Sequence, residues 1–389
     1  MYFTDEPEHV AILRDMIKRF VKDEMPREKR RQLDKDHTFC RDTFRKLADL
    51  GVCGLTVPEE FGGQGIDLVA AVAVLDELCQ VGPSLGGPFI HAAFYGGANV
   101  VENGSEAQKR ELLPKLAKGD IWFAYGLSEP DVGGDLATVK TRAHLEDDGK
   151  TVVVNGAKRW CTGADWADYI YCLVNSDAEG KKYKNLTVLL IPTDAAGISM
   201  QPIEHSNLRY TASCDVFFDD VRIPVERVLG GPEGWNKGWS MLAGRTLDVE
   251  KIEITTVTYG VARAAVEEAW AYAQERVQFG KPIAAHQAVR HALSGAKTKL
   301  QACQHMLYHA VHLAHEGKPC SVETSMAKLF VADTAVEIVL ACQQVMGAYG
   351  LTDSYDMERN VRDVLGMPIV GGSSNMQRNN IAARLGLPQ

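Results

Sequence analysis

The segment TVVVNGAKRW (residues 151–160) decides the fold, because the spacing of apolar residues changes there. It follows a turn, EDDGK, and its β-branched residues are typical of a strand. Similar runs follow along the chain: ADYIYCLV (167–174), NLTVLLIP (185–192) and CDVFFDDVRIP (214–224). Turn-forming Gly, Asn and Asp residues separate them. We therefore predict a compact β domain over residues 123–232, either a sandwich or a barrel.

On both sides of this region the apolar spacing is helical. Val10, Leu13 and Ile17 recur at three- and four-residue intervals, which gives one apolar helix face. Apolar residues at helical spacing continue to about residue 116, and a glycine-rich segment, VPEEFGGQGID, interrupts them at residues 57–67. Residues 1–122 are therefore predicted to form an N-terminal helical domain.

A helical pattern also follows the β region. Further helices are predicted over residues 286–316, 322–349 and 374–384. The chain lacks the strand–helix alternation of a doubly wound parallel sheet. We predict an α+β fold in which residues 233–389 form a C-terminal four-helix bundle.

Charge and cysteine usage limit the possible functions. The 389 residues carry a net charge of −9, so a surface that tracks nucleic-acid phosphates is not expected. The nine cysteines are odd in number and form no C-x-x-C pair, which favours reduced thiols in a cytosolic-type compartment. We find no secretory signal and no apolar run of membrane-spanning length. A cytoplasmic protein without a nucleic-acid partner is expected.

The common nucleotide-binding and hydrolase motifs are absent, including G-x-G-x-x-G, G-x-x-x-x-G-K-[ST], H-E-x-x-H and G-x-S-x-G. Histidines 305, 309, 312 and 315 fall at helical spacing, so two of them could bind a metal. A zinc site normally needs a third ligand and supporting partners, which this stretch does not supply. No metal site is predicted.

Three segments could contact a ligand, and each has a structural alternative. LSEPDVGGD (127–135) suits a loop around a polar ligand, or a surface turn. Trp160 and Thr162 lie two apart on a strand, which suits a planar heterocycle, although a core tryptophan is the more common case. RVQFGKPI (276–283) could grip a pyrophosphate, or could simply end a helix.

Together these segments resemble the acyl-CoA dehydrogenase family, in the same order and across nearly the whole chain. The matching stretches are VPEEFGGQGID, LSEPDVGGD, AKRWCTG, CDVFFDDVRIP, LDVEK, RVQFGKPIAAHQ, QVMGAYG and MERNVRD…GGSSNMQRNNIA. The resemblance implies a flavoprotein, usually a homotetramer, that desaturates acyl-CoA thioesters between Cα and Cβ. It also implies FAD as the cofactor and an electron-transfer flavoprotein as the electron acceptor.

The resemblance also implies roles for individual residues. Residues expected to contact FAD are Leu127, Ser128, Gly133, Trp160, Thr162, Arg276, Gln278, Phe279, Gln344, Met346, Gly347, Ala348, Ser373 and Asn375. Among them, the segments at 276–279 and 344–348 are similar to those that reach the FAD of a neighbouring subunit. Residues expected at the CoA moiety are Asp248, Lys251 and Gly134, the last standing where the family has a serine.

The catalytic base is where this sequence departs from the common pattern. Many family members carry their glutamate at the position of Gly371. The isovaleryl-CoA and long-chain branches instead place it in an L-D-x-E stretch, which here is Leu247 to Glu250. The resemblance thus implies Glu250 as the base, while the Gly371 N–H still donates to the thioester oxygen. The missing side chain at Gly371 favours a branched, cyclic or bulky acyl group.

Two other functions stay open at this stage. The vacant base position also fits a non-catalytic or half-site subunit of a hetero-tetramer. Other flavin chemistry on the same fold, such as desulfination or oxidation by O₂, needs no α-proton abstraction. Without the resemblance, Glu250 would be read as a solvated glutamate in the first turn of a helix.

Overall fold

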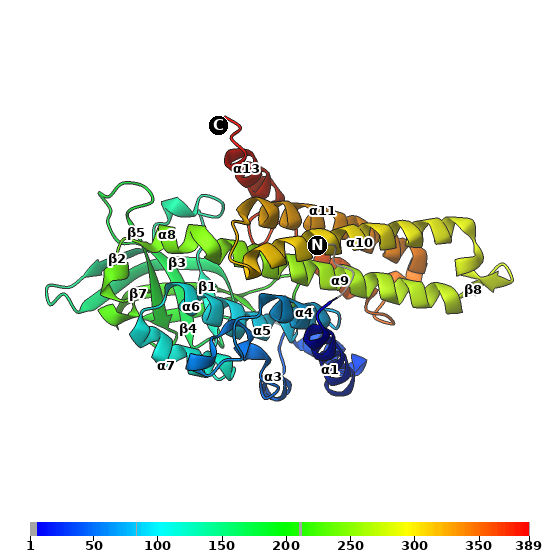
Figure 1. Cartoon of the computed structure of the whole chain (residues 1–389), viewed down its shortest axis with the longest axis horizontal. Helices are drawn as coiled ribbons and strands as arrows, with labels where there is room; N and C mark the ends of the chain where they lie inside the picture. The colour runs from blue at the N-terminus through cyan, green and yellow to red at the C-terminus, as the bar shows by residue number, and fades with distance from the viewer. Residues whose placement is uncertain (1–5, 83, 210–211, 389) are drawn as a thin grey trace.

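The computed structural model describes residues 6–82, 84–209 and 212–388. Within these ranges a helical N-terminal region, a β-sheet region and a helical C-terminal region follow one another along the chain (Figure 1). The predicted α+β class and the order of its three parts are confirmed. The sheet and the far end of the C-terminal helices lie at opposite ends of the long axis of the molecule.

The N-terminal region is built around one fully buried helix. Its helices are α1 (Glu8–Glu24), α2 (Arg27–Asp36), α3 (Arg41–Ala48), α4 (Leu68–Cys79), α5 (Gly86–Phe89), the π-helix η3 (Ile90–Ala98), α6 (Asn99–Asn103) and α7 (Glu106–Ala117). All twelve residues of α4 are buried, consistent with its nearly continuous apolar sequence. Asp67 caps this helix by accepting from the Ala70 N–H at 2.9 Å.

In the described part of the chain, seven strands form one sheet. They are β1 (Phe123–Gly126), β2 (Arg142–Leu145), β3 (Thr151–Thr162), β4 (Tyr169–Asn175), β5 (Leu186–Pro192), β6 (Ile198–Ile203) and β7 (Ser213–Pro224). The strand order is β1-β4-β2-β3-β7-β6, with β5 on β4. The long pair β3 and β7 is antiparallel and contains two register shifts, one of them between Lys158 and Cys161.

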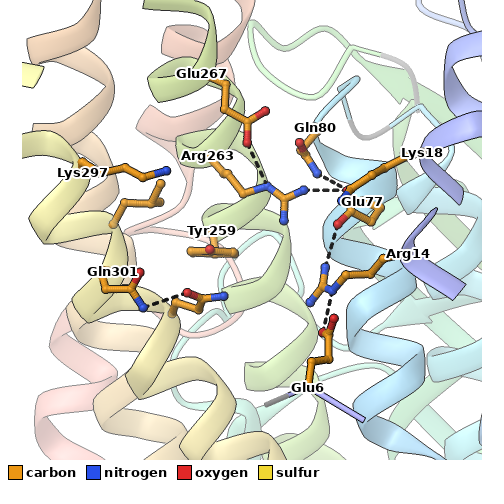
Figure 2. Close-up of a pocket in the computed structure, with 12 residues that line it drawn as sticks. Glu6, Arg14, Lys18, Glu77, Gln80, Tyr259, Arg263, Glu267, Lys297 and Gln301 are labelled. Atoms are coloured by element: carbon orange, nitrogen blue, oxygen red, sulfur yellow. Dashed lines mark hydrogen bonds and ion pairs between the residues drawn. The ribbon is translucent and has the colours of Figure 1, made fainter. Parts of the chain in front are cut away.

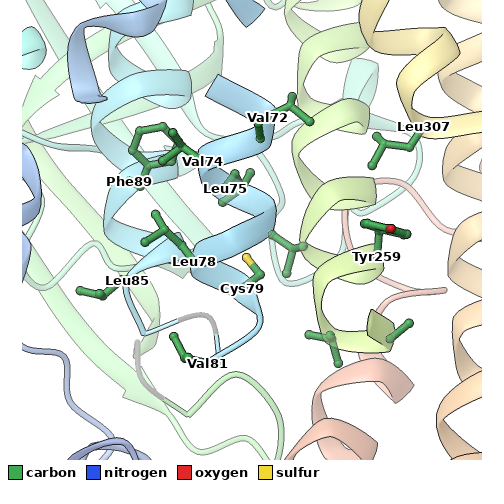
Figure 3. Packing of buried hydrophobic residues seen from close by; sticks show 14 of the residues in the cluster. Val72, Val74, Leu75, Leu78, Cys79, Val81, Leu85, Phe89, Tyr259 and Leu307 are labelled. Carbon is green, nitrogen blue, oxygen red and sulfur yellow. The ribbon is translucent and has the colours of Figure 1, made fainter. Parts of the chain in front are cut away.

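Long and short helices build the C-terminal region. They are α8 (Gly238–Met241), the π-helix η7 (Leu242–Thr246), α9 (Leu247–Glu275), α10 (Gln287–His315), α11 (Ser321–Met346), α12 (Met357–Gly366) and α13 (Ser374–Arg384). Helix α9 packs on α10 and α11 and also on α4 of the N-terminal region. Figure 3 shows Leu75, Leu78 and Cys79 of α4 beside Tyr259 of α9 and Leu307 of α10. One apolar core therefore joins both helical regions.

A buried ionic cluster fixes α1, α4 and α9 together (Figure 2). Arg14 lies 2.7 Å from Asp76 and 2.8 Å from Glu77, and Arg263 lies 2.6 Å from each of the same two carboxylates. The ionic cluster borders a cavity of about 740 Å³. Because these charges neutralise one another, the cluster is a structural junction between helices.

Among the described residues, one helical stretch, Ser321–Leu351, is long and apolar enough to cross a membrane by length and composition, because it contains an 18-residue window with a mean hydropathy of 1.5. The expectation that no apolar run reaches that length was therefore wrong. The stretch contains α11, which packs against α9, α10, α12 and α13, so part of its apolar surface faces other helices of the bundle, while Phe330 and Leu340 are exposed.

All nine cysteines are free, and none of the described residues form a group of three or more His, Cys, Asp or Glu that could hold a metal.

Candidate functional site

The loop after β1 is tied firmly to β3. Lys158 Nζ donates to the Leu127 carbonyl at 3.1 Å, and the Arg159 N–H donates to the Ser128 carbonyl at 2.9 Å. Lys158 also forms a buried ion pair with Glu129 at 2.8 Å. These contacts hold the loop against the strand that carries the predicted tryptophan, so the two predicted segments lie together.

Trp160 is exposed, in contrast to the core tryptophan that its sequence context favoured. Its side chain is 55% exposed, and its backbone has a φ of 64° beside the register shift of β3. The Arg159 guanidinium lies over the indole, 4.8 Å from the ring centre. The Thr162 hydroxyl lies 2.9 Å from the Ser213 hydroxyl. A flat aromatic face and two hydroxyls are therefore available at this end of the β3–β7 pair.

The glycine-rich loop between α12 and α13 packs on α9. Gly371 has a φ of 61°, and a Cβ built on it would lie 3.0 Å from Cγ1 of Ile254. Ser373 caps α13 by accepting from the Met376 N–H at 3.3 Å, and Asn375 is exposed. A Cβ on Gly134 would lie 3.1 Å from the Met376 sulfur, so the loop after β1 reaches the start of α13.

Two glutamates lie on one face of α9. Glu250 and Glu253 are three residues apart, which places them on neighbouring turns of the same side. Burial raises the pKa of Glu250 to about 7, although the Lys251 and Lys328 charges oppose this shift. Burial, together with the Glu250 charge, raises the pKa of Glu253 well above its usual range. Glu250 can therefore accept a proton near neutral pH.

Gly371 and Glu250 lie on the same side of α9. Ile254 follows Glu250 by four residues, so both side chains lie on one helix face, and Ile254 packs directly on Gly371. Among the described residues, none accepts a hydrogen bond from the Gly371 N–H. A base and a free backbone donor thus lie on the same side of α9.

Aromatic residues surround this face on the N-terminal side. Tyr95 of η3 stacks on Tyr125 of β1, with ring centres 3.8 Å apart, and the Asn99 amide donates to the Tyr125 hydroxyl at 2.5 Å. Burial and the charges of Glu253 and Glu250 raise the pKa of Tyr95 well above its usual range. The two glutamates therefore face a largely apolar, aromatic wall.

Asp248 and Lys251 point toward α11. Their side chains form an ion pair at 2.9 Å, and Asp248 also accepts from the Ser321 hydroxyl at 2.5 Å. Both residues are 7% exposed. Their charges are thus satisfied within the chain, which leaves little of either side chain for a ligand.

The remaining predicted cofactor residues lie at the far end of the helical bundle. Strands β8 (Val277–Gln278) and β9 (Lys281–Pro282) form a hairpin there (Figure 1). Its two turn residues, Phe279 and Gly280, both have positive φ, as a type I′ turn requires. Phe279 is 94% exposed. This segment is therefore a projecting hairpin, which corrects the alternative of a simple helix end.

The segment after α11 lies beside that hairpin. The Arg276 guanidinium lies over Tyr349, 5.6 Å from the ring centre. Gln344, Gly347 and Ala348 are exposed, whereas Met346 is 2% exposed and belongs to the core. The structure thus separates the predicted cofactor residues into two groups, one at the sheet and one at the far end of the bundle.

Three family models match almost the whole chain. They are the N-terminal, middle and C-terminal domains of acyl-CoA dehydrogenase, at residues 7–120, 124–221 and 236–386. The chain belongs to the acyl-CoA dehydrogenase family. It is an oxidoreductase of that family, whose members are FAD flavoproteins.

Individual relatives span the full length of this acyl-CoA dehydrogenase. The probable acyl-CoA dehydrogenase YngJ of Bacillus subtilis is 31% identical, over 96% of this chain and 97% of its own. The 3-(aryl)acrylate reductase of Clostridium sporogenes is 31% identical, over 99% and 100%. The CarC subunit of the caffeyl-CoA reductase–Etf complex of Acetobacterium woodii is 30% identical, over 99% of both chains.

Solved structures share the fold. The butyryl-CoA dehydrogenase of Megasphaera elsdenii superposes with a TM-score of 0.93 at 26% identity, covering 99% of this chain and 100% of that one. A chain from a study of the electron transferring flavoprotein of Acidaminococcus fermentans superposes with a TM-score of 0.94 at 28% identity, covering 100% of both chains.

The residues of this acyl-CoA dehydrogenase fit FAD. The exposed indole of Trp160 and the neighbouring hydroxyls suit a flat ring system with polar edges. The exposed Arg276 suits a pyrophosphate. Trp160 belongs to β3 in the sheet, whereas Arg276 directly precedes β8 at the far end of the bundle, so both could contact one FAD only if a second chain contributed one of them.

Sequence reasoning missed several residues of the site. Glu253 could have been found from its helical spacing to Glu250. Lys328, which is buried and donates to the Met367 carbonyl at 2.9 Å, is one of several charged residues of α11, so the sequence does not single it out as buried. Tyr95 and Tyr125 come from separate elements, and no local pattern links them.

Proposed function

We propose that this chain catalyses the α,β-dehydrogenation of an acyl-CoA thioester, with Glu250 as the base. One observation carries the proposal: Glu250 is a carboxylate with a pKa of about 7, on the face of α9 that packs against the Gly371 loop. A general base works best when its pKa lies near the working pH. Because Glu250 and Ile254 share one face of α9, the Glu250 carboxylate lies on the side where a substrate beside the Gly371 loop would bind, and it could take a proton from that substrate.

The Gly371 N–H is proposed to donate to the thioester oxygen. As the α proton leaves toward Glu250, negative charge grows on that oxygen, and a fixed backbone donor stabilises it. The bound FAD would accept the hydride from the β carbon. The aromatic wall of Tyr95 and Tyr125 would exclude water from the carboxylate.

A preference for a branched, cyclic or bulky acyl group is also proposed, and only the missing side chain at Gly371 supports it. Ile254 already packs where a side chain on Gly371 would lie, so the missing glutamate leaves less free volume than the sequence suggested. Any extra room must then come from Ile254 itself, whose side chain can change rotamer.

The partners are also proposed. An electron-transfer flavoprotein as acceptor is supported by the caffeyl-CoA reductase–Etf subunit, which is 30% identical. A homo-oligomer, with a homotetramer as the family's usual form, is supported by the separation of the two cofactor groups. The predicted cytoplasmic location stays a prediction.

The decisive experiment is anaerobic mixing of the purified flavoprotein with a panel of straight, branched and cyclic acyl-CoA thioesters. We expect the flavin absorbance to bleach in the unchanged protein and to remain in Glu250→Gln. Glu267→Gln is the matched control, because Glu267 is an exposed acid further along α9. Full bleaching in Glu250→Gln would remove Glu250 as the base.

The same experiment tests the other functions. A chain that purifies without flavin, or that never bleaches alone, would support the half-site subunit. Bleaching that persists without Glu250 would favour chemistry that needs no α-proton abstraction. The 3-(aryl)acrylate reductase relative supports a further possibility, the reverse direction. Oxidation of the reduced flavin by an enoyl-CoA would detect it, since the same base would then return the proton.

A further inference from the structure

Glu253 is a buried acid without a partner among the described residues. Its side chain lies in α9 and the residue is 1% exposed, yet neither carboxyl oxygen makes a hydrogen bond with any of these residues. Leaving a polar group in this state is unfavourable, and buried polar groups in proteins nearly always have a hydrogen-bond partner. The position therefore calls for a partner that is not a side chain of this chain.

The surroundings of Glu253 are those of the acyl side of the proposed site. Glu250 is one helical turn before it, and the electrostatic influence of both acids reaches Tyr95 and Tyr125. These tyrosines belong to η3 and β1, so three separate elements meet around Glu253. Asp248 and Lys251, near the expected CoA side, lie toward the start of the same helix.

Burial and charge act on Glu253 in the same direction. Burial, and then the Glu250 charge, raise the pKa of Glu253 well above its usual range. This shift favours the uncharged carboxylic acid, which can donate one hydrogen bond and accept others. A neutral acid is suited to a hydroxyl or carbonyl group on a ligand.

We propose that Glu253 determines substrate specificity by hydrogen-bonding an oxygen substituent on the distal part of the acyl chain. This inference rests on the proposed function. Glu253 lies about 4.5 Å beyond Glu250 along α9. Counted from the α carbon, about four bonds of an extended chain span that length, so the oxygen atom would be attached to the fifth carbon of the acyl chain. An ammonium substituent is disfavoured, because the aromatic wall would strip its water.

The test compares two substrates of the same shape, 5-hydroxyhexanoyl-CoA and 5-methylhexanoyl-CoA. We expect the unchanged protein to favour the hydroxylated thioester by about tenfold or more in kcat/KM, as sites built for a polar group do. Glu253→Leu should reverse this preference, and Glu253→Gln should keep part of it because an amide still donates and accepts. Glu267→Leu, an exposed acid on the same helix, should leave the ratio unchanged.

Binding gives a readout that does not depend on turnover. The affinities of the two corresponding enoyl-CoA products, measured by calorimetry, should show the same preference and the same loss in Glu253→Leu. Flavin content and circular dichroism establish that each variant has folded, and Glu253→Gln serves if the leucine variant has not.

Each failure has a distinct meaning. If both thioesters are oxidised with ratios that Glu253→Leu does not alter, an ordered water or nothing at all satisfies Glu253, and the inference is wrong while the proposed function stands. A higher kcat/KM for 5-aminohexanoyl-CoA would replace the neutral oxygen by a cation and also overturn it. If no thioester is oxidised by any variant, the proposed function itself fails.

Discussion

Placing a side chain at Gly371 should destabilise the protein by a predictable amount. The backbone φ of 61° costs an alanine about 1–2 kcal/mol, because its Cβ crowds the neighbouring carbonyl. The new Cβ would also lie 3.0–3.3 Å from three atoms of Ile254, and such overpacking costs about 1–3 kcal/mol. For Gly371→Ala we therefore expect a loss of about 2–5 kcal/mol in the free energy of unfolding.

A double-mutant cycle separates the two causes. Ile254→Ala removes two of the three contacting atoms, Cγ1 and Cγ2, so the pair Gly371→Ala/Ile254→Ala should recover most of the packing part and keep the backbone part. The assay is urea unfolding followed by circular dichroism. Gly295→Ala is the control, because Gly295 lies within α10 and a Cβ there meets no atom within 4 Å. This control should gain about 0.5–1 kcal/mol.

The result also bears on the position of the base. If Gly371→Ala leaves stability within about 0.5 kcal/mol of the parent, the backbone argument is refuted. If the loss is as expected, the double change Glu250→Gly/Gly371→Glu should be unstable and inactive. A glutamate at Gly371 would have to accept the same φ and displace Ile254, so the base could not be moved back by a simple exchange.

Three further outcomes are expected. Because Glu250 must be ionised to accept the proton, kcat/KM should fall about tenfold per pH unit below a midpoint near 7. Lys328→Met should raise that midpoint, because the Lys328 charge opposes the raised pKa of Glu250. A kcat/KM that does not change with pH above about 5.5 would contradict this expectation. Lys158→Met should cost about 3–5 kcal/mol in urea unfolding, because the Glu129 charge stays buried, and Glu129→Leu added to it should restore most of the loss. Phe279→Ser should reduce the flavin that the protein retains and the oligomer mass measured by light scattering. It should leave the secondary structure unchanged, because this side chain is 94% exposed. An unaltered oligomer would argue against the hairpin as a contact between subunits.

The sequence predicted elements well where local pattern and end signals agree. The stretches expected at 286–316 and 374–384 correspond to α10, Gln287–His315, and α13, Ser374–Arg384. The helix expected at 322–349 ends earlier, at Met346, because Gly347 has a φ of 59° and stops it. Apolar spacing and glycine positions are local properties, so they can be read along the chain.

The site was less accessible to sequence reasoning, because its geometry comes from distant segments. Trp160 is exposed only since β3 shifts register beside it, which alternation cannot reveal. The contact of Asp248 and Lys251 with the CoA moiety stays a prediction, and only the structure reveals that their charges are satisfied toward α11. Glu253 was overlooked because a charged residue in a helix is usually solvated, and only its burial makes it unusual.

Two local departures from α-helical geometry frame the proposed site. The π-helix η3 carries Tyr95, and the π-helix η7 leads directly into α9, four residues before Glu250. A π-helical turn contains an extra residue, which rotates the following side chains around the helix axis. Gly244 within η7, with φ −92° and ψ −133°, departs from helical geometry altogether. The direction in which both acids point is thus set just before α9 begins. Regular helices through these segments would rotate Tyr95 relative to Glu250 and Glu253, which turn together on α9, and would take the base away from its aromatic surroundings.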